Sequence, residues 1–113
     1  EAIESLVDQL SNWYVRRNRR RYWKGESGDD KQAAYLTLYE VLDIVTRLIA
    51  PFMPFLSEEM YQNLVRRPFP DHHESVHLGA WPEVKAKLLN DTLVYQMDVV
   101  QKVVGLGRAT REK

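Results

Sequence analysis

A run of cationic side chains mixed with aromatic ones is the feature of this sequence with the clearest chemistry. Six arginine and lysine residues and no acidic residue lie between Arg16 and Lys24, and Tyr22 and Trp23 lie within the same segment. Clustered guanidinium groups bind phosphates through charge and paired hydrogen bonds, while an aromatic ring offers a flat face to an unstacked base. The segment therefore has the side chains that a single-stranded RNA contact requires.

A second interpretation of the same segment needs no ligand. Runs of charge often form a solvated helix face, and individual surface ion pairs contribute little to stability. In that case Arg17 and Arg21 would pair across the fold with acidic residues, for which the candidates are Asp43, Glu40, Glu58 and Glu59. Composition alone leaves both interpretations open.

No other group of residues predicts chemistry. His72, His73 and His77 are mixed with acidic residues, but their spacing matches no defined metal site. Ser75 lacks the strained turn of a hydrolase nucleophile, and the pair Gly105 and Gly107 lacks the strand and third glycine of a phosphate loop. We therefore expect no catalytic residue, no metal and no cofactor in this chain.

The elements that position the basic segment are predicted to be helices. Apolar residues at helical spacing indicate a helix over about 2–24, a second from Asp29 or Asp30 to about residue 50, and a third over about 54–65. Asp29 or Asp30 is expected to cap the second helix. An irregular loop follows the third over 68–82, and Asn90 is expected to cap a last long helix. The sequence thus predicts an all-α fold, an antiparallel helical bundle of about four helices.

The faces of the third helix follow from the same periodicity. Phe55, Met60 and Leu64 are expected to point toward the core, and Phe52 to be held there by the adjacent prolines. Three polar residues are expected to face water, namely Glu58, Glu59 and Gln62.

Length and composition restrict the class of protein. With 113 residues, 44% hydrophobic and 28% charged residues, and a net charge of +0, the chain is predicted to form one globular domain over residues 1–113. No apolar stretch is long enough to span a membrane, and no secretory signal is present. Both ends have the pattern expected of boundaries within a larger chain.

Four segments together resemble the isoleucyl-tRNA synthetase family of class Ia aminoacyl-tRNA synthetases, at its anticodon-binding domain. The most specific segment is LSNWYVRRNRRRYW at residues 10–23. AYLTLYEVL at residues 34–42, LIAPFMPFLSEEMY at residues 48–61, and ESVHL at 74–78 with Trp81 and Pro82 agree in order. The segment at 48–61 is also similar to valyl and leucyl synthetases, so the arginine segment selects isoleucine.

The resemblance implies a parent enzyme that attaches isoleucine to its tRNA with ATP and magnesium in the cytoplasm, its catalytic domain lying elsewhere in the same chain. This domain would hold the tRNA for isoleucine by its anticodon arm. Carried onto this sequence, the expected RNA-contacting residues are Arg16, Arg19, Arg20, Trp23 and Lys24. The alternatives are a helical protein-interaction module or the equivalent domain of a valyl or leucyl synthetase.

Overall fold

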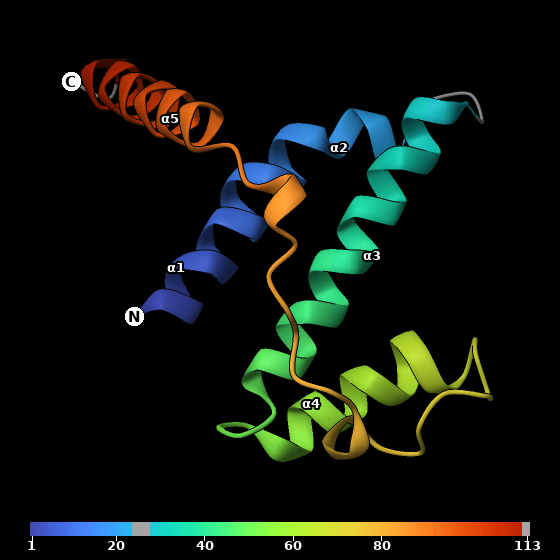
Figure 1. Cartoon of the computed structure of the whole chain (residues 1–113). Helices are drawn as coiled ribbons and strands as arrows, with labels where there is room; N and C mark the ends of the chain where they lie inside the picture. Colours follow the sequence, from blue (N-terminus) through green and yellow to red (C-terminus); the bar gives the residue numbers. More distant parts are fainter. Residues whose placement is uncertain (24–27, 112–113) are drawn as a thin grey trace. The chain divides into compact units, whose positions relative to one another are not determined.

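The computed structural model describes residues 1–23 and 28–111, which are helical without any strand (Figure 1). The chain divides into two compact units, Glu1–Pro82 and Glu83–Lys113. Four long helical segments within the described residues confirm the all-α prediction. In those residues no helix has both the length and the apolar character needed to cross a membrane.

The first helical segment is continuous but not uniform. It consists of α1 (Ala2–Asp8), a π-helical stretch η1 (Gln9–Val15), and α2 (Arg16–Trp23), and the backbone stays helical through both junctions. The predicted helix is therefore confirmed as far as Trp23, while its expected last residue, Lys24, lies outside the described residues. The π-helical stretch was not predicted. Because its hydrogen bonds span five residues, it shifts the side-chain register between α1 and α2.

The second helix, α3 (Asp29–Ile49), begins and ends where the sequence indicates. Gly28 is its N-cap in extended conformation, and no side chain caps it, so the expected capping by Asp29 or Asp30 was wrong. Both carboxylates instead lie in the first turn, where the helix dipole favours them. At the other end Pro51 cannot donate a backbone hydrogen bond, and the chain turns before α4. The first helical segment and α3 run in opposite directions (Figure 1).

The third helix comprises α4 (Pro54–Tyr61) and a π-helical end, η2 (Gln62–Arg66), as predicted in extent. Its most buried residues are Ser57, Tyr61 and Val65. Of the residues predicted to face the core, Met60 and Leu64 are half-buried, whereas Phe55 is 90% exposed. Phe52 is 73% exposed as well, so both phenylalanines were wrongly assigned to the core.

The rotation of this helix follows from the loop that packs on it. Glu58 accepts hydrogen bonds from Ser75 Oγ at 2.8 Å, from the backbone N–H of Val76 at 3.1 Å and from Gln62 Nε2 at 2.7 Å. Gln62 also donates to the carbonyl of Glu74. The predicted exposure of Glu58 and Gln62 to water was therefore wrong, since both fix the loop that packs Val76 into the core.

That loop confirms the irregular segment predicted over 68–82. It contains one short 3-10 turn, η3 (Val76–Leu78), whose N-cap Ser75 accepts from the N–H of His77. Val76 joins Ala50, Tyr61 and Val65 in one buried cluster, with Leu64 packed against it.

The unit Glu83–Lys113 holds a short 3-10 turn, η4 (Ala86–Leu88), and the long helix α5 (Asp91–Arg111). The side chain of Asn90 accepts from the N–H of Leu93 at 3.0 Å, which confirms the predicted cap. Gly105 and Gly107 lie inside this helix without ending it.

We predict that Glu58→Gln lowers the free energy of unfolding at neutral pH by about 1–3 kcal/mol, because three donors lose a shared carboxylate. Although burial raises the pKa of Glu58, hydrogen bonds from Gln62, Ser75 and Val76 lower it overall. A lowered folded pKa means that the stabilisation is complete above the ordinary glutamate pKa of about 4.3 and is lost as the pH falls through the folded value. Denaturant unfolding of both proteins across this range measures the effect.

The matched control is Glu59→Gln, which removes the same charge from an exposed neighbour whose carboxylate accepts from Asn63 on its own helix. Its unfolding free energy should change by less than about 0.5 kcal/mol. Equal losses in the two variants would show that Glu58 does not fix the loop.

Candidate nucleic-acid interface

The helix α2 divides into two opposite faces. At about 100° per residue, Asn18, Arg21 and Tyr22 lie on one side, and the remaining arginines lie on the other side or between the two. Asn18 and Arg21 are half-buried, and Tyr22 is buried with 8% of its surface exposed. This inner face is the one that packs against α3.

Arg21 makes a multiple hydrogen-bonded contact with α3. Its Nε donates to Asp30 Oδ2 at 2.8 Å, and its Nη2 donates to Asp30 Oδ1 at 2.6 Å and to the Asp30 carbonyl at 3.1 Å. Its Nη1 donates to Asn18 Oδ1 at 3.2 Å, and Asn18 in turn donates to the carbonyl of Tyr14. A two-point guanidinium–carboxylate contact fixes orientation as well as distance.

The electrostatics agree with this geometry. The hydrogen bond from Arg21 lowers the pKa of Asp30, and that bond raises the pKa of Arg21 in return. Arg21 thus contacts α3, as one interpretation of the sequence suggested, but its partner is Asp30, whose side chain is 75% exposed, rather than one of the four acidic residues considered. Of those, Asp43 pairs with Arg47, and Glu58 accepts from the loop.

Tyr22 strengthens the same contact and is unavailable to RNA. Its ring packs edge-to-face on Tyr35 at a centroid distance of 5.2 Å, and Tyr35 Oη donates to the Tyr22 carbonyl at 3.3 Å. Burial first, and then Tyr14, raise the pKa of Tyr22 to about 12. Of the two rings considered for base stacking, only Trp23 remains accessible.

The outer face of α2 carries four of the five residues expected to contact RNA. Arg16, Arg19, Arg20 and Trp23 follow the spacing i, i+3, i+4 and i+7, which places them on one side of an α-helix. All four are exposed, and Trp23 exposes 78% of its surface. The fifth expected residue, Lys24, lies outside the described residues.

Two arginines of α2 lie over aromatic rings. The guanidinium carbon of Arg19 is 5.7 Å from the centre of the Trp23 ring, and that of Arg17 is 5.4 Å from the centre of the Trp13 ring. Arg17 is exposed but is directed back along the helix toward half-buried Trp13, so it belongs to neither face. Arg19 and Trp23 form one cation–π unit on the outer face.

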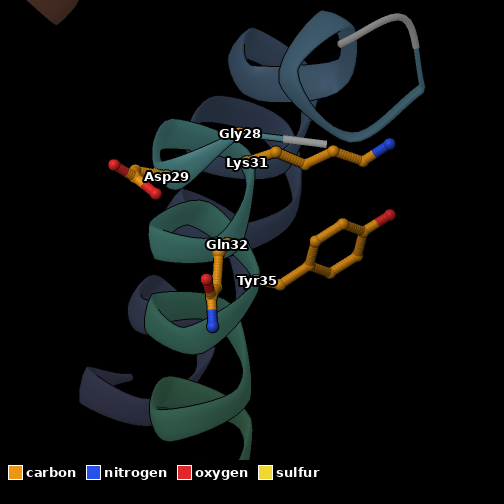
Figure 2. Close-up of a pocket in the computed structure, with 5 residues that line it drawn as sticks. All are labelled: Gly28, Asp29, Lys31, Gln32 and Tyr35. Atoms are coloured by element: carbon orange, nitrogen blue, oxygen red, sulfur yellow. The ribbon is translucent and has the colours of Figure 1, made fainter. Parts of the chain in front are cut away.

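A shallow pocket of about 360 Å³ lies at the start of α3, near this interface (Figure 2). Figure 2 shows Lys31 and Tyr35 directed to one side of the helix and Asp29 to the other. The free N–H groups of a helix start attract anions, but Asp29 and Asp30 place negative charge in the same turn. We assign no phosphate site to this pocket. No group of three metal-ligating side chains occurs in the described segments.

Sequence reasoning missed two positioning residues, Asn18 and Asp30. The signal for Asn18 was available, since it lies three residues before Arg21 and an amide at that spacing reaches the guanidinium. The role of Asp30 was hidden, because nine residues separate it from Arg21 and only the turn between the two helices brings them together.

Comparison with known proteins identifies the family of the chain. The whole sequence, residues 1–113, matches the family described as the anticodon-binding domain of tRNA ligase. The chain therefore belongs to this family of tRNA-ligase domains.

The most similar relatives include three proteins named isoleucine–tRNA ligase. The one from Thermus thermophilus is 56% identical over 108 residues, the one from Clostridium novyi 52% over 109, and the one from Streptomyces avermitilis 49% over 111. These alignments cover 96% to 98% of this chain and 10% of each relative. The chain thus spans about a tenth of the length of the relatives it matches. The resemblance to the isoleucyl branch is confirmed in preference to the valyl or leucyl one.

Proposed function

We propose that the outer face of α2 is the surface through which this domain contacts the anticodon arm of a tRNA. The observation that carries the proposal is the sorting of side chains on α2. Arg16, Arg19, Arg20 and Trp23 lie together on an exposed face, while Arg21 and Tyr22 hold the opposite face on α3. Three cations and an indole ring remain available together.

The chemistry of this face suits a folded RNA with unpaired bases. Arg16 and Arg20 are one helical turn apart, so both can bind phosphates along the same strand. Trp23 offers a ring for an unstacked base, and Arg19 can hold a base from the other side or bind a phosphate. Lys24 is part of the proposal by its place in the sequence.

We further propose that the whole protein is an isoleucine–tRNA ligase that acts in the cytoplasm on the tRNA for isoleucine. The three relatives named isoleucine–tRNA ligase support this proposal through their identity over almost the entire chain. ATP and magnesium would be bound by the catalytic domain of the same protein, to which this chain contributes RNA binding.

If Arg16 and Arg20 bind phosphates, the double variant Arg16→Ala/Arg20→Ala should bind tRNA at least about tenfold more weakly at low salt, because two charge-assisted hydrogen bonds are lost. The slope of log affinity against log salt should fall by about 2, one for each phosphate contact. Fluorescence anisotropy with labelled tRNA for isoleucine measures both quantities, and circular dichroism checks that the helices are kept.

The control is Arg67→Ala/Arg108→Ala, which removes two exposed arginines from elsewhere in the chain. If tRNA affinity depended only on the net charge of the chain, both double variants would lose the same affinity. That result, or unchanged binding in the α2 variant with intact helicity, would contradict the proposal.

Replacing Trp23 tests base stacking separately from charge. Trp23→Leu should weaken tRNA binding by about five- to a hundredfold, since stacking on an aromatic ring contributes about 1–3 kcal/mol per base. The salt slope should stay unchanged, and Trp23→Phe should restore part of the affinity. Trp81→Leu, at a second exposed tryptophan (59% exposed), serves as the control. An equal loss in Trp23→Leu and Trp81→Leu would rule out stacking on Trp23.

A further inference from the structure

A second concave site lies within Glu1–Pro82, between the later turns of α3, the helix α4 with η2, and the loop that follows. Its volume is about 440 Å³, which is within the range of small-molecule sites. The residues that carry its chemistry are Tyr39, Asp43, Arg47, Phe69, His72 and His73. We call this site the Arg47 recess.

An ion pair supplies the polar part of the recess. Arg47 Nη2 donates to Asp43 Oδ2, and the two side chains are only 29% and 20% exposed. Arg47 Nε is buried without an acceptor among the described residues, while the side chain as a whole keeps 29% of its surface exposed. The exposed part of the guanidinium lines the recess, where its N–H groups can donate to a ligand that brings an acceptor.

Aromatic side chains supply the rest of the wall. Tyr39 packs edge-to-face on Phe69 at 6.4 Å, and Phe69 packs edge-to-face on His72 at 5.9 Å. Tyr39 Oη donates to the Leu64 carbonyl at 3.1 Å, and Tyr61 Oη donates to the His73 carbonyl at 3.0 Å. The first bond joins α3 to η2 and the second holds the loop on α4, while Phe69 remains 49% exposed and accessible.

We propose that the Arg47 recess binds a nucleobase. The ion pair places a donor, the Arg47 guanidinium, beside an acceptor, the Asp43 carboxylate. A nucleobase edge with adjacent C=O and N–H groups complements this arrangement. Because Asp43 balances the charge of Arg47, a bare phosphate gains little there, whereas a planar heterocycle also packs against the aromatic wall. A base in an RNA strand and a free nucleotide share this chemistry.

The recess is separate from the outer face of α2. The side chain that anchors α2 on α3 is Asp30, and the rise of 1.5 Å per residue puts Asp43 about 20 Å further along that helix. The proposal therefore does not rest on the RNA contact proposed for α2. It can fail or hold independently.

The test is a titration of the isotope-labelled chain, followed by the shifts of backbone amide NMR signals. The probes are adenosine 5′-monophosphate, uridine 5′-monophosphate, a single-stranded RNA hexamer, and ribose 5-phosphate as the probe without a base. We expect the base-containing probes to shift the amides of Asp43, Arg47, Phe69 and His72, and ribose 5-phosphate to leave them unchanged. The shifts should persist in Arg16→Ala/Arg20→Ala, which separates this site from the one on α2.

Phe69→Leu should lower the nucleotide affinity measured from these shifts at least about fivefold, because one stacking ring is removed. Arg47→Lys should lower it as well, because lysine lacks the planar guanidinium group. Phe52→Leu, at another exposed phenylalanine, should not change it. Shifts with mononucleotides alone would identify a free nucleotide as the ligand, and shifts with the hexamer as well would identify RNA. Equal shifts with ribose 5-phosphate, shifts confined to residues 16–23, or no shifts at millimolar probe would each overturn the proposal.

Discussion

The contact between Arg21 and Asp30 is the constraint on which the proposed RNA surface depends. An isolated helix with five arginines in eight residues has no preferred side toward a partner. Once Arg21 is bound by two carboxylate oxygens and Tyr22 is buried against Tyr35, α2 has one fixed inner face. The outer face is then determined by helical geometry alone, and it consists of three exposed arginines and Trp23.

The helix α3 organises the rest of the unit Glu1–Pro82. Its first turn anchors α2 through Asp30, and its later turns provide Tyr39, Asp43 and Arg47 to the Arg47 recess. Glu58 completes this arrangement from α4, because its carboxylate holds the loop that packs Val76 into the core. Charged residues thus make structural contacts near both ends of α3. For this reason the number of charged residues in a segment does not tell which of them bind a ligand and which stabilise the fold.

Much of this architecture could be predicted because its signals are local. Helical periodicity, the helix stop at Pro51 and the helix cap at Asn90 all act through neighbours in the sequence. The helices that these signals predict are confirmed. Apart from the local error at the N-cap of α3, the wrong assignments involve partners distant in sequence. Phe55 has the apolar character of a core residue, but the residues of α4 that pack into the fold are Ser57 and Tyr61, and Phe55 points to the other side of the helix. Likewise, the carboxylate that binds Arg21 could not be predicted, since Asp30 is brought to Arg21 only by the fold.

The most direct test compares two aspartates in the first turn of α3 by tRNA affinity. Asp29→Asn and Asp30→Asn each remove one negative charge, so a surface governed by charge alone would bind tRNA equally or more tightly in both. The account predicts that Asp29→Asn binds at least as tightly as the unchanged protein, whereas Asp30→Asn binds more weakly because α2 is no longer held in orientation. Equal affinities of the two variants would contradict it.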